Sequence, residues 1–463
     1  MLDQKGSAPP LRTKDGSIRV AFVRQVARAI ASRDVETLRA MVGDLHEADL
    51  GAVIEALEAA DRPRLVELLG IDFDFTALTE VDDSVREEIL DELAPRTVAE
   101  GVRDIESDDA VAILEDLPKH EQTEILDQLP PPERVALARR LDYPGESAGR
   151  HMQTEFIAVP PIWNVGQAID YMRETADLPE HFYKLYVVDD SRHFLGAVPL
   201  DRLLRSKRPV PISNLMEPEG HRVRAEEDQE EVARLFQRYD LVTAPVVDAD
   251  DRLVGVITFD DVADVIEEEA EEDIKALGGV TSDEELSDTV WTIARGRFNW
   301  LLINLGTAFV ASSVLGLFEG QLQKMVALAV LAPIVASQGG NATTQTMTVA
   351  VRALATQDLS DANARRVILR ELMVGVLNGV AFAVITGIAA YVWFRVPGLG
   401  LVIGLAMICN MIAAALGGIL IPLALNRLKI DPAVASSPFV TTVTDVVGFF
   451  SFLSIATLWF GLR

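Results

Sequence analysis

A single acidic side chain stands inside the last long apolar run of this sequence. Asp445 follows Pro438-Phe-Val-Thr-Thr-Val-Thr, so hydroxyl groups, including that of Thr441, accompany the carboxylate. An ionised side chain within a membrane span is costly and usually faces a water-filled cavity or a partner. Mg²⁺ prefers one or two carboxylates with water to an all-protein cage. We therefore expect Asp445 to line a path for a hard divalent cation.

A second apolar run is interrupted by neutral polar residues. It contains Pro333 and then Gly339-Gly340-Asn341-Ala-Thr-Thr-Gln345. Proline and paired glycines weaken a helix and free carbonyl groups, so we expect this span to be locally broken. Membranes tolerate such a break only beside protein or water. Packing of helices through small residues is the alternative explanation. We expect Gly340, Asn341 and Gln345 to join Asp445 and Thr441 in the ion pathway.

Other chemistries lack the residues that they need. The lone Cys409 lies in an apolar run, and none of the six histidines lies in a span or beside a plausible nucleophile. Clustered zinc or copper ligands, redox chemistry and enzymatic catalysis are therefore not expected. The chain has no phosphate-binding GxxxxGK[ST] loop, so no ATPase motor is expected. Such a motor is not required, because a membrane potential that is negative inside contributes ~4.6 kcal/mol per 100 mV to the entry of a divalent ion.

The elements that carry these residues are membrane spans. Spanning takes about 20 apolar residues, and five segments qualify: roughly 298–318, 325–351, 367–394, 399–425 and 438–461. Arginine and lysine gather before the first segment and in the second and fourth connections. The positive-inside rule then places the N-terminus in the cytoplasm and the C-terminus outside. We expect a multi-pass protein of the cell (inner) membrane, with residues 291–463 as its transmembrane domain.

The preceding residues are soluble and acidic. Of the 71 acidic residues only six follow residue 290, and the net charge of the chain is −29. Such a surface repels nucleic acid and attracts cations. Residues 1–17 are expected to be disordered, and 18–147 to form a superhelix of short helices, since apolar residues recur at helical spacing between Pro-rich and Asp-rich breaks. An acidic run predicts a connecting helix over 266–290.

An internal repeat with an offset of 59 residues lies between these parts. Asp189 is followed seven residues later by Gly196, and Asp248 by Gly255, each between two short apolar strands. The pattern resembles a tandem pair of cystathionine-β-synthase (CBS) domains, here 148–210 and 211–265. Thr258 and Asp261 are similar to the ribose-contacting signature of nucleotide-binding CBS domains, which implies ATP or another adenine nucleotide. The first copy carries Pro199 and Arg202 instead.

The complete order of parts resembles the MgtE-type magnesium channels. The resemblance rests on Pro333 with Gly339-Gly340-Asn341 and Gln345, and on Asp431-Pro432 followed by Pro438 to Asp445. It implies a homodimer with a helical N-terminal domain, a CBS pair, a plug helix and five spans. It also implies regulatory Mg²⁺ sites at Asp108, Asp228, Glu230, Asp240, Asp261, Asp264, Glu269, Glu272 and Asp273. Ala112 stands where a second acid is expected one turn after Asp108.

These expectations combine into one mechanism. Mg²⁺ enters down its electrochemical gradient, and intracellular Mg²⁺ closes the pore by bridging acidic faces of the cytoplasmic domains. It can do so only if it binds the closed state better than the open state. Two alternatives stay open at this stage. The pore could carry Co²⁺ or Mn²⁺, or the chain could be a membrane-anchored CBS nucleotide sensor without transport.

Overall fold

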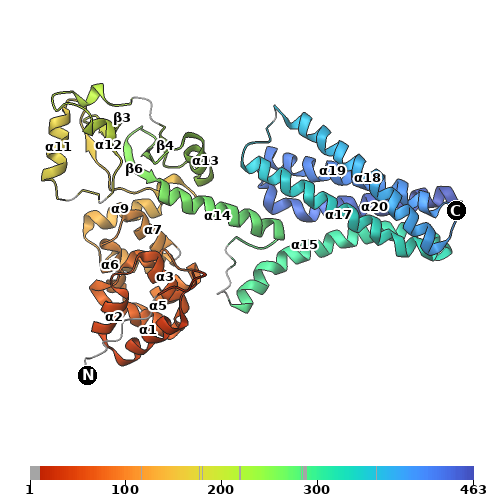
Figure 1. Cartoon of the computed structure of the whole chain (residues 1–463), viewed down its shortest axis with the longest axis horizontal. Helices are drawn as coiled ribbons and strands as arrows, with labels where there is room; N and C mark the ends of the chain where they lie inside the picture. The colour runs from red at the N-terminus through yellow and green to blue at the C-terminus, as the bar shows by residue number, and fades with distance from the viewer. Residues whose placement is uncertain are drawn as a thin grey trace. The chain divides into compact units, whose positions relative to one another are not determined.

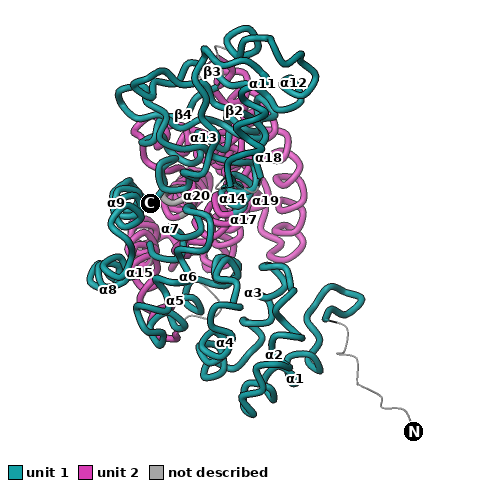
Figure 2. Tube along the Cα trace, turned by 90° about the vertical axis from the view of Figure 1, so that its left-hand side faces the viewer, with its two compact units in different colours: residues 1–267 teal, residues 268–463 magenta. Residues whose placement is uncertain are grey.

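The computed structural model describes residues 11–115, 117–176, 178–179, 181–217, 221–282, 284, 289–360 and 362–462, without the side chains of 434–437. The first ten residues of the segment expected to be disordered lie outside this range. The chain divides into two compact units, residues 1–267 and 268–463, which Figure 2 shows in teal and magenta. Each unit is described by itself.

Short helices build the first part of unit 1 (Figure 1) and confirm the helical expectation. Their apolar faces share one core, which runs from Phe22 to Leu137. Pro95 opens α6 and Pro131 opens α9, at positions where the missing N–H costs nothing. The helices are α1 (Val20–Ser32), α2 (Val35–Val42), α3 (Glu47–Ala56), α4 (Arg62–Leu69), α5 (Asp83–Glu92), α6 (Pro95–Arg103), α7 (Ser107–Glu115), α8 (Lys119–Leu126) and α9 (Pro131–Leu141).

Two three-stranded sheets of the same topology follow, as the repeat predicts. In each sheet the first strand is parallel to the second, and the second is antiparallel to the third. Val187 pairs with Gly196 in one sheet and Val246 with Gly255 in the other. The elements are β1 (Ala158–Val159), α11 (Val165–Glu174), β2 (Lys184–Val188), β3 (Phe194–Pro199), α12 (Leu200–Leu204), β4 (Val223–Arg224), α13 (Gln229–Tyr239), β5 (Thr243–Val247) and β6 (Leu253–Thr258).

The two repeats exchange their leading segments. The short helix α10 (Ala148–His151) and Met152 lie in the core of the second repeat, although the sequence places them at the start of the first. Met216 packs in the core of the first repeat. The backbone explains the exchange, because Gln153 pairs with Val256 of β6, and Glu217 pairs with Ala197 of β3.

The acidic connection is a helix, α14 (Phe259–Gly278), that starts in unit 1 and ends in unit 2. It begins directly after β6, and its Val262 and Val265 pack in the core of the second repeat. It ends at Gly278, well short of the expected residue 290. Gly279 adopts a φ of +73°, which glycine tolerates best. Residues 283 and 285–288 of the expected helix lie outside the described residues.

Five helices among the described residues are long and apolar enough to cross a membrane, as predicted. They are α15 (Val290–Leu317), α17 (Val326–Ala355), α18 (Ala364–Phe394), α19 (Leu399–Arg427) and α20 (Pro432–Phe460), with a short α16 (Glu319–Lys324) between the first two. The most buried is α19, which packs against α17, α18 and α20, whereas α15 and α18 expose apolar faces. The expected local break in the second span is wrong, because α17 is one continuous helix around Pro333.

Candidate functional site

Asp445 lies half-buried on α20, inside a membrane span. In the described part of the chain its carboxylate has no hydrogen-bond or ion-pair partner. The hydroxyl groups around it are already used, since Thr442 donates to the Pro438 carbonyl at 2.5 Å and the buried Thr444 donates to the Thr441 carbonyl at 2.9 Å. A lone carboxylate in this setting is expensive unless water or a cation meets it.

The polar residues of α17 form one exposed stripe. Asn341, Thr344 and Gln345 are all exposed, as are Ser337 one turn before and Thr348 one turn after them. Their spacing of three or four residues puts them on one face of the helix. An added Cβ at Gly340 would meet no atom within 4 Å, so this glycine also borders open space. Amides facing lipid are costly, and this face therefore needs water or another protein chain.

Asn410 joins the two helices that carry these residues. Its side chain is fully buried on α19, and its Nδ2 donates to the Val335 carbonyl of α17 at 2.7 Å. Gly339 of α17 and Gly448 of α20 face the same amide, and a Cβ at Gly448 would lie 2.9 Å from Nδ2. Gly339 directly precedes Gly340, and Gly448 lies one turn after Asp445. One amide thus fixes the crossing of α17, α19 and α20 next to the expected pathway.

The expected regulatory residues of α13 lie at opposite ends of that helix. Asp228 caps its N-terminus by accepting from the Glu230 backbone N–H at 2.9 Å, and Glu230 forms an ion pair with Arg234. Asp240 ends the helix with a φ of +52°. A helix of 11 residues is about 16 Å long, so one ion cannot be held by both ends within one chain.

Asp108 and Asp261 are brought together, as a shared site requires. Asp108 in the first turn of α7 is buried, and its carboxyl group interacts electrostatically with that of Asp261 in the first turn of α14. Burial raises the pKa of Asp261, and the Asp108 charge raises it further. Burial, followed by the charges of Asp108 and Glu106, raises the pKa of Asp109 to about 8. The helical domain therefore meets the second CBS repeat at a group of acids of which Asp108 is buried and the others are half-buried.

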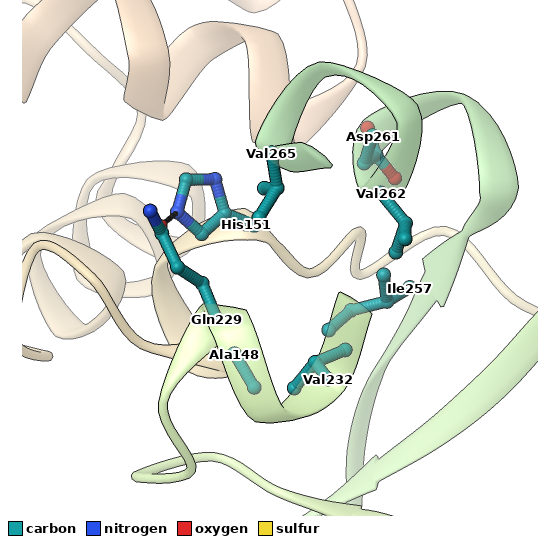
Figure 3. Close-up of a pocket in the computed structure, with 8 residues that line it drawn as sticks. All are labelled: Ala148, His151, Gln229, Val232, Ile257, Asp261, Val262 and Val265. Atoms are coloured by element: carbon teal, nitrogen blue, oxygen red, sulfur yellow. Dashed lines mark hydrogen bonds between the residues drawn. The ribbon is translucent and has the colours of Figure 1, made fainter. Parts of the chain in front are cut away.

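The two residues expected to contact a nucleotide form hydrogen bonds with each other. Thr258 donates its hydroxyl to Asp261 Oδ2 at 2.5 Å and its backbone N–H to the same atom at 3.2 Å. The pocket beside Asp261, drawn in Figure 3, is lined by Ala148, His151, Gln229, Val232, Ile257, Val262 and Val265. Its volume of about 10 Å³ has room for one water molecule. A nucleotide would have to open this pocket.

The remaining acids lie along α14. Asp264, in unit 1, is exposed. Glu269, Glu272 and Asp273 follow in unit 2 at a spacing that places them on one face. Burial raises the pKa of Asp273, the nearby Asp431 raises it further, and Arg352 opposes the shift. The end of α14 also packs against α17 and α20 through Ala276, in a small core with Met347 and Val440.

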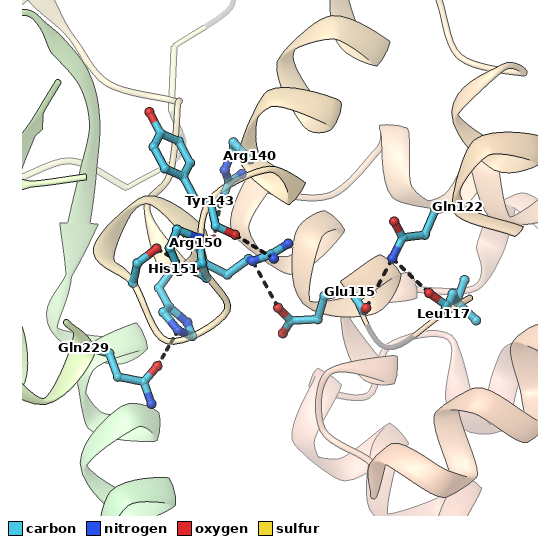
Figure 4. Close-up of polar contacts among 10 residues, drawn as sticks. Glu115, Leu117, Gln122, Arg140, Tyr143, Arg150, His151 and Gln229 are labelled. Carbon is cyan, nitrogen blue, oxygen red and sulfur yellow. Dashed lines mark hydrogen bonds and ion pairs between the residues drawn. The ribbon is translucent and has the colours of Figure 1, made fainter. Parts of the chain in front are cut away.

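The expected metal residues do not gather into a ready-made cage. Among the residues that the structure describes, no three His, Cys, Asp or Glu side chains are grouped so that they could hold a metal ion. The sequence analysis missed Arg140, a buried arginine in the last turn of α9 whose Nη2 donates to the Arg150 carbonyl at 3.1 Å (Figure 4). Nothing in the sequence distinguishes it from Arg134 and Arg139 of the same helix, which are not buried.

Comparisons with known proteins cover nearly the whole chain. The MgtE family model, described as a divalent cation transporter, matches residues 332–455; the MgtE intracellular N domain matches 45–146, and CBS domains match 148–208 and 212–268. The magnesium transporter MgtE of Thermus thermophilus is 34% identical over 447 residues, which cover 93% of this chain and 96% of that protein. The corresponding protein of Bacillus subtilis is 27% identical over 91% of this chain and 94% of its own length.

A solved structure of a related soluble part is also similar. The cytosolic domain of the Mg²⁺ channel MgtE in complex with ATP shares 30% sequence identity and a TM-score of 0.48, covering 52% of this chain and 99% of that chain. The family models follow one another along the chain in the order that the sequence analysis expects. This chain therefore belongs to the MgtE family of divalent cation transporters, and it is a multi-pass membrane protein.

Proposed function

We propose that this chain carries Mg²⁺ across the cell membrane, with Asp445 as the one acidic ligand that each chain contributes to the pathway. The observation that carries the proposal is the lone Asp445 carboxylate within a span, without a cation of its own in the described part of the chain. The stripe around Asn341 and Gln345 supplies neutral oxygens on the neighbouring α17. Thr441 and Gly340 complete the proposed lining. A hydrated Mg²⁺ suits this combination of few charges and several neutral oxygens.

We infer that two copies of the chain form the pathway. The stripe on α17 is exposed in the single chain, although the helix has the length and hydropathy of a membrane span. A second copy that faces the stripe would remove these amides from lipid and would add a second Asp445. Two carboxylates match the preference of Mg²⁺ for one or two such ligands. The dimer thus follows from the same surface as the ion pathway.

The direction of transport follows from charge. We place the N-terminus in the cytoplasm and the C-terminus outside, because Arg295, Arg297 and the basic residues of the second and fourth connections lie on one side. A membrane potential that is negative inside then drives Mg²⁺ inward, without an ATPase.

We further propose that intracellular Mg²⁺ closes the pathway by binding the acidic residues of the cytoplasmic part. The proposed positions are Asp228, Glu230, Asp240, Asp264, Glu269, Glu272 and Asp273, with Asp108 and Asp261 at the domain junction. The packing of the α14 end against α17 and α20 supports this, because it connects the acidic helix to the two pathway helices. Sites of this kind need water or a second chain to complete them.

The decisive experiment is Mg²⁺ flux into proteoliposomes with the internal Mg²⁺ concentration varied. Wild type should conduct at low internal Mg²⁺ and close as it rises, and Asp445→Asn should not conduct. Glu371→Gln is the matched control, because Glu371 is also an acid near a span but pairs with Arg370 at 3.1 Å. Absence of flux from folded wild type would refute transport, whereas flux through Asp445→Asn would refute the role of this carboxylate. Competition by Co²⁺ and Mn²⁺ in the same vesicles tests the other ions.

An adenine nucleotide such as ATP is the second candidate ligand, at Thr258 and Asp261. The hydrogen bonds between these residues support a carboxylate held ready for hydroxyl donors. Calorimetric titration of wild type and Asp261→Asn with ATP tests the site. Equal affinity of both proteins for ATP would mean that Asp261 does not contribute to nucleotide binding.

A further inference from the structure

The helical domain contains a cavity that the proposed transport does not use. Its volume is about 350 Å³, and small-molecule sites typically measure about 300–1,000 Å³. Its lining comes from the end of α4, from residues 70–75, and from α6 with the two residues that follow it. All of these residues belong to unit 1. The cavity is therefore a candidate binding site within one compact unit.

Two aromatic rings and an isoleucine give the cavity its apolar surface. Phe73 and Phe75 are buried, and their rings meet edge to face with centroids 5.3 Å apart. Gly101 lets α6 approach these rings, because a Cβ there would lie 2.3 Å from the Phe75 ring. Ile71 lines the same cavity although its side chain is 95% exposed. A ligand with methylene groups would cover apolar surface here that now faces water.

The charged part of the lining is entirely acidic. Glu67 on α4 and Asp104 directly after α6 are exposed, and among the described residues neither carboxylate has a hydrogen-bond or ion-pair partner. Asp74 accepts a backbone N–H at 3.1 Å in the turn that follows it, and Glu100 pairs with Arg96 at 2.9 Å. No lysine or arginine in the described part of the chain lines the cavity. The cavity therefore favours a cation.

The arrangement of the acids favours an extended cation over a metal ion. No three His, Cys, Asp or Glu side chains among the described residues are grouped so that they could hold a metal ion, so the carboxylates of this cavity do not converge on one point. A linear polyamine carries its ammonium groups apart, with methylene segments between them, and such groups stay protonated at neutral pH as lysine does. Each ammonium can meet a different carboxylate while the methylene groups contact the aromatic rings. Mg²⁺ keeps most of its water and gains nothing from an apolar lining.

We propose that this cavity binds a linear polyamine, with Glu67 and Asp104 pairing with its ammonium groups and Ile71, Phe73 and Phe75 contacting its methylene chain. The proposal goes beyond Mg²⁺ transport and does not rest on it. A bound polyamine would connect the end of α4 to the end of α6, because its two acidic partners lie on these two elements.

The test is calorimetric titration of the full-length protein in detergent micelles, with millimolar Mg²⁺ present to occupy other acidic sites. Spermidine is the probe, and hexaamminecobalt(III) is the control ligand, because it has the same charge in a compact form without methylene groups. Glu67→Gln/Asp104→Asn removes two acids, and Ile71→Ser removes an apolar contact. Glu36→Gln is the matched control variant, because Glu36 is an exposed acid of the same domain outside the cavity. All four replaced side chains are exposed, so each variant should fold.

Wild type and Glu36→Gln should bind spermidine equally, and more tightly than hexaamminecobalt(III). The double acid variant should weaken spermidine binding about 4- to 25-fold, because each exposed ion pair contributes about two- to fivefold. Ile71→Ser should weaken it about three- to tenfold, since part of the burial of an apolar side chain is lost, and should leave hexaamminecobalt(III) unaffected. Hydrogen exchange read by mass spectrometry should show that spermidine protects residues 67–75 and 97–105.

Four results would each overturn the proposal. They are equal affinity of wild type for the two ligands, a double acid variant that binds spermidine like Glu36→Gln, an Ile71→Ser variant that binds it like wild type, and protection only outside the two segments. Since ion flux is not measured, failure of the transport proposal would leave these results unaffected.

Discussion

Two adjacent glycines of α17 should respond oppositely to the same substitution. A Cβ added to Gly339 would overlap the side-chain amide of Asn410, whereas a Cβ added to Gly340 would meet nothing within 4 Å. Gly339→Ala must therefore displace Asn410, which is fully buried and bonded to the Val335 carbonyl. Overpacking typically costs about 1–3 kcal/mol, and a hydrogen bond between membrane helices about 0.6 kcal/mol. We expect Gly339→Ala to lose about 2–4 kcal/mol of folding free energy.

The neighbouring substitution provides the matched control. Gly340→Ala should be neutral or up to about 1 kcal/mol more stable, since alanine favours helix more than glycine does. Shortening the opposing side chain should relieve the overlap. The double variant Gly339→Ala/Asn410→Ala should therefore be more stable than the sum of the single effects by about 1–2 kcal/mol.

Denaturant titration of the full-length protein in mixed micelles measures these differences. The reasoning is refuted if Gly339→Ala is as stable as Gly340→Ala, or if the effects of Gly339→Ala and Asn410→Ala simply add. Either result would mean that Asn410 does not occupy the crossing of α17, α19 and α20. Circular dichroism of each variant before titration establishes that the comparison begins from folded protein.

Three further predictions address the pathway, the junction and the CBS pair. Asp445→Asn should weaken Mg²⁺ binding by at least about tenfold in equilibrium binding measurements on the purified protein, because a unit charge about 4 Å from a divalent ion contributes about 2 kcal/mol even in bulk water. Unchanged affinity would contradict this. Burial lowers the pKa of His151 from 6.5, so the folded protein keeps it neutral while the unfolded chain protonates it, and its stabilising contribution should be lost as the pH falls below 6.5. In denaturant titrations across this range, the unfolding free energy should depend on pH less steeply in His151→Asn than in wild type, by up to about 1.4 kcal/mol per pH unit. The same pH dependence in both proteins would refute the prediction. Tyr186→Phe should cost about 1 kcal/mol, because Tyr186 donates to Thr243 of the other repeat at 2.9 Å, and adding Thr243→Val should recover most of the loss in the same titrations.

Features that depend on residues close together in the sequence could be predicted from it. The five spans follow from apolar length alone, and the two sheets follow from the repeated strands around Gly196 and Gly255. The role of Asn410 depends on Val335, 75 residues away, and on two glycines from different helices. The sequence likewise cannot distinguish Gly339 from Gly340, because only packing decides which one faces a neighbour.

The expectation of a break in α17 was wrong because packing between helices, which the sequence does not show, stabilises this helix. Proline and paired glycines weaken a helix by themselves, but packing against α19 and α20 keeps this one continuous. Thr343 and Thr344 also donate their hydroxyls to the carbonyls of Gly339 and Gly340, at 2.9 and 3.0 Å. The carbonyl groups expected to face an ion are thus partly engaged within the helix, which leaves the exposed side chains of Asn341 and Gln345 as the better oxygen donors.

The acids of this chain differ in whether the protein already supplies their cation. Glu230 pairs with Arg234, and Glu371 pairs with Arg370. An external ion at these positions must compete with a tethered positive charge, and a competitor held in place by the fold loses little entropy on pairing. Asp445 has no such charge in the described part of the chain, and it lies within a membrane span. Among these acids, Asp445 in the membrane span therefore has the most to gain from a mobile cation.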